Sequence, residues 1–288
     1  YCNFDELQKE FTSTYRGIND RDLSEDMIQS SKSTIWKGLK RKLKRKQLKD
    51  TEAKTIVQRA VGQTDFKGFQ GVDVVIEAIV ENMEIKQKVI KELETVCHED
   101  FIFASNTSSL PLTEMSKAAK KPENVIGMHY FSPVPKMPLL EIIKTDQTSE
   151  ETLATCYEIG KRQGKTCIVV NDMPGFYVNR ILCPYLIEGL LMIEEGVRIE
   201  DIDGALTSLG MPIGPITLLD EVGIDVGAHV MSGNMAQLLK GREGFKINYS
   251  MPKMFEAGLH GRKAEKGFYN YAMKKGRLKK TKPNQDVY

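Results

Sequence analysis

The sequence of 288 residues predicts an α/β fold, in which a doubly wound parallel sheet is followed by an all-helical C-terminal domain. Strand-like apolar blocks alternate with amphipathic helices between about residues 72 and 171, at the spacing typical of such a sheet. Beyond residue 172 the apolar periodicity is helical, and Gly and Pro separate the segments. We therefore expect a sheet domain over 1–171, a helical domain over 172–272 and a basic tail over 273–288.

A helical hairpin is expected before the sheet. Residues 1–24 show no clear pattern, whereas apolar side chains recur on one face from residue 25 to about 48, and helical character resumes over 51–60. The run KRKLKRK at 40–46 is of a kind found in nucleic-acid-binding proteins. The net charge of +2 and the interleaved apolar stripe favour a solvated helix face instead, so no nucleic-acid partner is expected.

The sheet elements begin with the block VDVVIEAIV (72–80). This block is apolar and β-branched, as in strands that are buried on both faces of a parallel sheet. A helix follows, with one apolar face formed by Ile85, Val89, Leu93 and Val96. The other predicted elements are a strand over 101–105, a short helix opened by Pro111, strands over 124–131 and 139–144, a helix over 149–163 and a strand over 167–171.

The helical domain is expected to contain segments over 176–195, over 199–209 and from 216 onward. The glycines of GMPIGPITLLDEVG (210–223) are expected to form a tight junction between helices rather than a catalytic loop. Residues 274–288 are polar and basic, and we expect them to be disordered.

Composition excludes several classes of protein. Hydrophobic residues at 41% and charged residues at 28% are typical of a globular chain, and no apolar run is long enough to span a bilayer. Five cysteines without a CxxC pair favour reduced thiols over a disulfide framework. His229 and His260 lack metal-ligand spacing, so we expect no metal site and assign both to structural or surface positions.

The residues with most chemical content lie between 103 and 180. His129, on one strand-like run, is followed twelve residues later by Glu141 on another. Ser108 lies upstream in FASNTSSL, and Asn179 lies downstream in DMPGFYVNR. An imidazole backed by a carboxylate, with neutral hydrogen-bond donors nearby, can remove a proton from a hydroxyl group. The alternative is a core histidine that satisfies a buried acid.

One motif is absent. No G-x-G-x-x-G occurs in the chain, although the later segments are typical of a dinucleotide-binding enzyme. Backbone amides at such a turn hold the pyrophosphate, and a Cβ there would obstruct it. We therefore expect an incomplete, Rossmann-like sheet that lacks its first strand and Gly-rich loop, and weakened binding of a dinucleotide. The chain begins with Tyr1 rather than Met, so we expect a fragment of a longer protein.

The motifs together resemble the L-3-hydroxyacyl-CoA dehydrogenase family of fatty-acid β-oxidation. They are VVIEAIVEN (74–82), FASNTSSL (103–110), GMHYFSP (127–133), LLEII (139–143), DMPGFYVNR (172–180) and GRKAEKGFYNY (261–271). The form HYFSP and the basic KLKRKQL helix are most similar to the dehydrogenase module of the multifunctional α-subunit type. The resemblance implies NAD-dependent oxidation of an acyl-CoA 3-hydroxyl group, with the helical hairpin near the CoA moiety.

The resemblance also implies roles for single residues. His129 would be the general base, Glu141 would orient it, and Ser108 and Asn179 would donate hydrogen bonds to the substrate. The residues implied at the cofactor are Asp20 (with Asp22 as an alternative), Ala78, Glu81, Lys86, Ser105, Asn106 and Ser132. Taken alone, Lys86 would be assigned to a solvated helix face, and Ser105 and Asn106 to a turn.

The expected partners are an acyl-CoA substrate and either a second copy of the chain or the other subunits of a larger β-oxidation complex. The resemblance implies a mitochondrial location, in the matrix or at the inner membrane, with a peroxisomal location as the alternative. Two other functions stay open: a non-catalytic remnant that dimerises and binds acyl-CoA but not NAD, and a different hydroxyacid dehydrogenase. Enzymes of that second type usually rely on a lysine in the helical domain.

Overall fold

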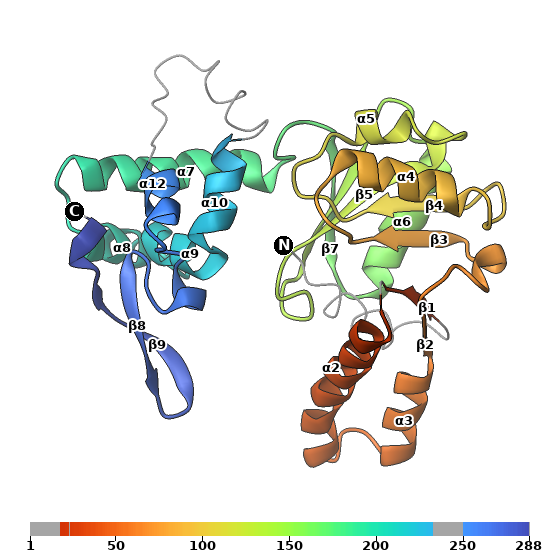
Figure 1. The fold of residues 1–288 in the computed structure, drawn as a ribbon, viewed down its shortest axis with the longest axis horizontal. Coiled ribbons are helices and arrows are strands. Elements are labelled where there is room, and N and C mark those ends of the chain that lie inside the picture. Colours follow the sequence, from red (N-terminus) through yellow and green to blue (C-terminus); the bar gives the residue numbers. More distant parts are fainter. Residues whose placement is uncertain (1–17, 23, 233–249, 288) are drawn as a thin grey trace. The chain divides into compact units, whose positions relative to one another are not determined.

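The computed structural model describes residues 18–22, 24–232 and 250–287, in two compact units, Tyr1–Phe176 and Tyr177–Tyr288. Figure 1 shows the fold along the chain. Residues 1–17 lie outside the described residues.

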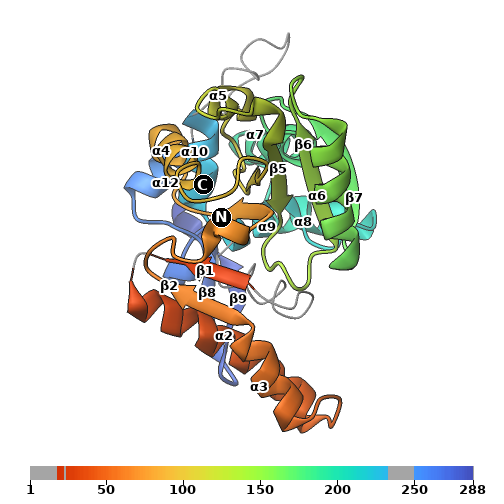
Figure 2. The same cartoon turned by 90° about the vertical axis from the view of Figure 1, so that its right-hand side faces the viewer.

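The first unit opens with a two-stranded parallel sheet and a helical hairpin. Strand β1 (Ile18–Arg21) pairs with β2 (Ala60–Gln63), and the connection between them contains α2 (Glu25–Lys44) and α3 (Asp50–Gln58). Ser24 caps α2 by accepting a hydrogen bond from the amide of Met27. A Cβ at Gly62 would collide with Ile28, so glycine lets α2 lie directly on β2. The two helices extend away from the main sheet (Figure 2).

The main sheet has five strands in the order β3-β4-β5-β6-β7, and only the β5–β6 pair among them is antiparallel. The strands are β3 (Val74–Glu77), β4 (Ile102–Ser105), β5 (Val125–Tyr130), β6 (Leu139–Lys144) and β7 (Thr166–Asn171). Strands β1 and β2 form a parallel sheet of their own, and the mostly parallel five-stranded sheet with helices on both faces is of the doubly wound type. The Rossmann-like fold class is confirmed.

Successive side chains of the strands point to opposite faces of this sheet, and helices cover both faces. On one face, α4 (Met83–Leu93) and α5 (Leu112–Ser116) pack on Phe103 and its neighbours. On the other face, α6 (Glu150–Arg162) packs on Ala104 and its neighbours. The sequence predicted that the block at 72–80 is the strand buried on both faces, but the strands in which every residue is buried are β4 and β5. That prediction was wrong because β3 is an edge strand of this sheet, and three of its four residues are half-buried.

The second unit is helical, as predicted, and also contains a β-hairpin. Its helices are α7 (Val178–Glu194), α8 (Ile199–Ser208), α9 (Pro215–Val222), α10 (Ile224–Ser232) and α12 (Ser250–Glu256). A Cβ at Gly214 would collide with Asp203 of α8, so the expected tight junction between helices is present. The short 3-10 helices of the chain are η1 (Phe69–Gly71), η2 (Pro122–Asn124), η3 (Arg262–Ala264) and η4 (Gln285–Val287).

The prediction of a disordered tail over 274–288 was wrong. Strand β8 (Tyr269–Lys274) and strand β9 (Arg277–Pro283) form an antiparallel hairpin. One basic residue of β9 is held by tertiary contacts: the ammonium of Lys280 lies 4.1 Å from the ring centroid of Tyr269 and 3.7 Å from a carboxylate oxygen of Asp203. Leu278 packs against the core of the unit. The high content of basic residues therefore did not predict whether the backbone of this segment is ordered.

Candidate active site

His129 and Glu141 form a direct contact inside the sheet. The antiparallel pairing of β5 and β6 places the two residues opposite each other. The Nδ1 atom of His129 lies 2.7 Å from Oε2 of Glu141, and the two residues are 4% and 0% exposed. Because a buried carboxylate needs a hydrogen-bond donor, Glu141 fixes the plane of the imidazole ring. The sequence prediction of this pair agrees with the geometry.

Ser108 occupies the other side of the same ring. Its Oγ atom lies 3.1 Å from Nε2 of His129. When Nδ1–H donates to Glu141, Nε2 is the ring atom that accepts a hydrogen. The rings of Phe131 and Phe176 lie 4.5 and 5.8 Å from the imidazole, between centroids. The histidine is thus held on several sides and presents one basic nitrogen to a hydroxyl group.

Glu81 holds the loop that carries Ser108. Its Oε1 atom accepts hydrogen bonds from the Thr107 hydroxyl at 2.6 Å, from the backbone amides of Ser108 and Ser109 at 3.0 and 3.1 Å, and from the Ser109 hydroxyl at 3.1 Å. Burial raises the pKa of this carboxyl group. The hydrogen bonds from the loop and the ammonium of Lys86 outweigh that effect, so the pKa of Glu81 lies below its usual value.

A second carboxylate, Glu77 at the end of β3, lies beneath this loop. Its Oε1 atom accepts from the Lys86 ammonium at 2.6 Å and from the amide of Ile79 at 2.7 Å, and its Oε2 atom accepts from the Ser105 hydroxyl at 2.7 Å. Lys86 also lies 3.5 Å from Glu81 and is only 1% exposed. The assignment of Lys86, taken alone, to a solvated face was wrong, because two buried carboxylates hold it.

Sequence reasoning missed Glu77. The signal was a carboxylate at the end of an apolar strand, where a charge needs a buried partner. Asn106 has a similar internal role, since its Oδ1 accepts from the amide of Tyr130 at 2.8 Å. The turn after β5 is tied down by Lys165, whose ammonium donates to the carbonyl oxygen atoms of Val134 at 2.6 Å and Met137 at 3.1 Å. The strand ends that carry the candidate residues are therefore cross-linked by buried polar contacts.

The first unit brings together most of the predicted residues. His129, Glu141, Ser108, Glu81, Lys86, Ser105 and Asn106 belong to one connected cluster. Ser132 lies in the turn after β5, next to a cis bond to Pro133. Asp20 lies in β1, Asp22 just after it, and Asn179 lies in the first turn of α7 in the second unit.

The edge where β3 and β4 end suits a dinucleotide. Ligands of open α/β sheets lie outside the carboxyl ends of the strands. Half-buried Ala78 is followed there by Ile79 and Val80, which are 36% and 61% exposed. Exposed apolar side chains beside a buried polar cluster can cover the flat face of a nicotinamide or an adenine ring. The residues at this edge therefore fit the cofactor that the sequence implied.

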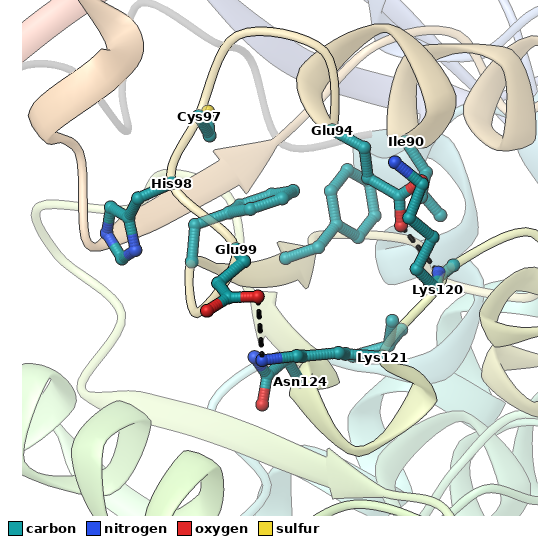
Figure 3. A pocket seen from close by; sticks show the side chains of 12 residues that line it. Ile90, Glu94, Cys97, His98, Glu99, Lys120, Lys121 and Asn124 are labelled. Carbon is teal, nitrogen blue, oxygen red and sulfur yellow. Dashed lines mark hydrogen bonds and ion pairs between the residues drawn. The ribbon is translucent and has the colours of Figure 1, made fainter.

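A pocket of about 270 Å³ lies elsewhere in the same unit, near the starts of β4 and β5 (Figure 3). Phe101, Phe103 and Val125 line it, and its rim carries Lys120 and Lys121. These cations already face Glu94 and Asp100. Because His129 lies near the opposite ends of these strands, this pocket does not belong to the cluster.

Metal ligands do not gather anywhere in the described part of the chain, where no group of three or more His, Cys, Asp or Glu side chains could hold an ion. His260 packs edge-on against the ring of Phe255, with 5.1 Å between centroids. The side chain of His229 lies outside the described residues. Over the described ranges, no helix is long and apolar enough to cross a membrane.

Two family sequence models match the chain. The NAD-binding domain of 3-hydroxyacyl-CoA dehydrogenase matches residues 11–173, and the C-terminal domain of 3-hydroxyacyl-CoA dehydrogenase matches residues 175–271. Strand β9 lies beyond the second match. The two matches meet close to the boundary between the two compact units.

Among the curated relatives, several are bacterial proteins. The fatty acid oxidation complex subunit alpha of Idiomarina loihiensis is 44% identical over 91% of this chain, and the subunit of Vibrio parahaemolyticus is 41% identical over 91%. The chain spans 36% and 37% of the length of these two relatives. The expected mitochondrial location, with its peroxisomal alternative, was wrong, because these relatives come from bacteria.

Two solved structures match the chain over nearly their whole length. The (S)-3-hydroxybutyryl-CoA dehydrogenase PaaH1 from Ralstonia eutropha is 32% identical, with a TM-score of 0.87, and the match covers 93% of this chain and 95% of that one. The structure of FadB2 from M. tuberculosis is 31% identical, with a TM-score of 0.86 and the same coverage of both chains.

Proposed function

Because the chain belongs to the 3-hydroxyacyl-CoA dehydrogenase family, we propose that it oxidises L-3-hydroxyacyl-CoA to 3-ketoacyl-CoA with NAD, as in fatty-acid β-oxidation. One observation carries the proposal: Ser108, His129 and Glu141 form a chain of contacts of 3.1 and 2.7 Å at the carboxyl end of β5. The NAD-binding domain matched over 11–173 and the apolar edge after β3 support the choice of cofactor.

The chemistry follows from the orientation of the ring. His129 accepts the proton of the substrate 3-hydroxyl group at Nε2, while Ser108 donates a hydrogen bond to the same oxygen. Glu141 stabilises the imidazolium that results, because its carboxylate is fixed 2.7 Å from Nδ1. NAD, when bound, supplies the acceptor for the hydride that leaves C3. Asn179 is assigned a second hydrogen bond to the substrate.

The residues assigned to the cofactor divide into two kinds. Ala78 and Ser132, with Asp20 for the adenosine ribose, are assigned direct contacts. Ser105, Asn106, Glu81 and Lys86 are buried in the cluster, and we assign them to shaping the surface on which the nicotinamide lies. The four side chains are already engaged with one another and with neighbouring strands, which supports this assignment.

The α2–α3 hairpin is assigned to the phosphates of the CoA moiety. Six cations between Lys40 and Lys46 are exposed, and within the described part of the chain no carboxylate lies at ion-pair distance from them. We expect the double reversal Lys42→Glu/Lys46→Glu to raise KM for acetoacetyl-CoA about two- to fivefold per cation, with KM for NADH unchanged. Lys88→Glu on α4 is the control. Trp36 packs in the hairpin and is the single tryptophan, so its fluorescence reports binding directly.

The proposal also covers the oligomeric state of the chain. The relatives are named as subunits of a complex and are much longer than this chain, so membership of a larger β-oxidation complex is one candidate. A homodimer is the other. Sedimentation of the 288-residue chain at micromolar concentration separates them, because a dimer of this chain alone needs no partner subunit.

The deciding experiment combines NAD(H) calorimetry with turnover of acetoacetyl-CoA and NADH. The proposal expects NADH binding and turnover, with turnover lost in His129→Ala. The absence of a G-x-G-x-x-G motif favours the second candidate, a non-catalytic remnant. A folded chain that binds acetoacetyl-CoA but not NADH would support that remnant. Turnover of free 3-hydroxy acids alone would instead refute the assignment of the substrate.

A further inference from the structure

We infer that Glu77 is a positioning residue for the proposed reaction: by holding Lys86, it keeps Glu81 bound to the loop 107–109 and so keeps Ser108 oriented on His129. This inference rests on the proposed function and deepens it. Glu77 touches none of the reacting groups, and its side chain is 1% exposed. Its effect must therefore pass through its neighbours.

The first step is the competition for Lys86. The ammonium lies 2.6 Å from Glu77 and 3.5 Å from Glu81, so its stronger contact is with Glu77. Glu77 and Lys86 are buried and the side chain of Glu81 is only 7% exposed, so water is a poor substitute for a lost partner. If Glu77 lost its charge, Glu81 would be the remaining carboxylate within reach of the cation.

The second step is the loop. The Oε1 atom of Glu81 accepts four hydrogen bonds from Thr107, Ser108 and Ser109. A Glu81 side chain drawn toward Lys86 weakens these hydrogen bonds, because shortening the 3.5 Å distance from its Oε2 atom to Nζ of Lys86 also shifts Oε1 relative to the loop. Ser108 would then lose the backbone anchor that sets its hydroxyl 3.1 Å from Nε2 of His129.

Glu77 also joins the two strand ends. Its Oε2 accepts from the hydroxyl of Ser105, which in turn accepts from the amide of Thr107 at 3.2 Å. Its backbone carbonyl accepts from the amide of Asn106 at 2.8 Å. The loop that carries Ser108 is therefore attached to Glu77 by one route through Ser105 and by a second route through Lys86 and Glu81.

The test is a double-mutant cycle between Glu77→Gln and Ser108→Ala, read in kcat and KM. Glutamine keeps the shape and removes the charge. We expect Glu77→Gln to lower kcat about 10- to 100-fold in the wild-type background and by no more than about twofold in Ser108→Ala. Equal losses in both backgrounds would refute the inference. Glu114→Gln, which breaks an exposed ion pair with Lys117, is the matched control.

A second readout does not depend on turnover. Hydrogen exchange of the amides at 107–110 should become roughly tenfold faster in Glu77→Gln, while amides of α6, on the other face of the sheet, stay unchanged. Unchanged exchange at 107–110 would overturn the inference. If the wild-type chain shows no turnover, the proposed function fails, and this comparison still decides the role of Glu77.

A further variant guards against misfolding. Glu77→Gln/Lys86→Met removes the cation together with its partner, so Glu81 should return to the loop and restore slow exchange at 107–110. If Glu77→Gln does not fold, slow exchange in the folded double variant supports the inference. Fast exchange there, or a double variant that also fails to fold, shows that Glu77 acts by packing alone and refutes it.

Discussion

Replacing Glu141 by glutamine removes one charge from the candidate site and leaves its shape unchanged. The residue is fully buried and faces His129 across the β5–β6 pair, with 2.7 Å between Oε2 and Nδ1. Solvent cannot replace the missing charge. The substitution therefore isolates what the carboxylate contributes to the proposed reaction.

The magnitude follows from the type of hydrogen bond. A bond to a charged group contributes about 1.5–3 kcal/mol and a neutral one about 0.5–1.5 kcal/mol, so the imidazolium loses roughly 1–1.5 kcal/mol of stabilisation. This loss corresponds to about tenfold in rate. If the glutamine amide donates to Nδ1 instead, the proton moves to Nε2, and the loss approaches about 10⁴-fold. We expect kcat of Glu141→Gln to fall at least about tenfold.

The assay is the reduction of acetoacetyl-CoA by NADH at saturating concentrations, with thermal unfolding as a check on folding. Glu114→Gln serves as the control for a lost carboxylate at an exposed position. A folded Glu141→Gln variant that retains kcat within about twofold, beside an inactive His129→Ala, would refute the assigned role of the carboxylate.

Other predictions concern stability and reactivity. The pKa of Glu81 lies below its usual value of 4.5, so the ionised carboxylate contributes its full stabilisation above that pH and loses it as the pH falls through the folded-state pKa. In urea unfolding, the difference in free energy of unfolding between wild type and Glu81→Gln should therefore become smaller below about pH 4.5. Burial raises the pKa of Cys156 to about 12 and of Cys183 to about 11, so alkylation of both at pH 8 should be slow until the chain unfolds, and rapid labelling of the folded chain would contradict this. Asp220 accepts hydrogen bonds from two backbone amides and a tyrosine hydroxyl, so Asp220→Asn should cost about 1–3 kcal/mol in the free energy of unfolding, whereas an unchanged denaturation midpoint would show that these bonds contribute little.

The parts of the fold that depend on local pattern were predictable. The helix expected over 149–163 begins after its cap Ser149 and ends at Arg162, and the strand at 139–144 has the predicted bounds. The pairing of His129 with Glu141 was predictable as well. Each of these rests on periodicity or on a motif that lies within a short window of the sequence.

The side-chain contacts that form only once neighbouring elements pack together were not predictable. Lys86 has the spacing of an exposed helix residue, and only the fold brings it to Glu77 and Glu81. From its sequence, the basic strand β9 is predicted to be a disordered tail. In the structure, Lys280 lies over the ring of Tyr269 on the facing strand of the hairpin. In both cases the partner lies on the neighbouring element of the chain, and the contact depends on how the strand and helix, or the two strands, fold back on each other.

The register of β5 and β6 fixes the His129–Glu141 pair independently of the segment that connects the two strands. Backbone hydrogen bonds between the strands set the distance from His129 to Glu141, so the residues that connect the strands do not. Within this connection Phe131 packs on the imidazole, Ser132 is assigned to the cofactor and Val134 is buried, whereas residues 135–138 are exposed. Residues 135–138 can therefore change in length or composition without moving the base away from its carboxylate, and for protein engineering they are a region where the shape of a binding surface can be redesigned independently of the acid–base pair.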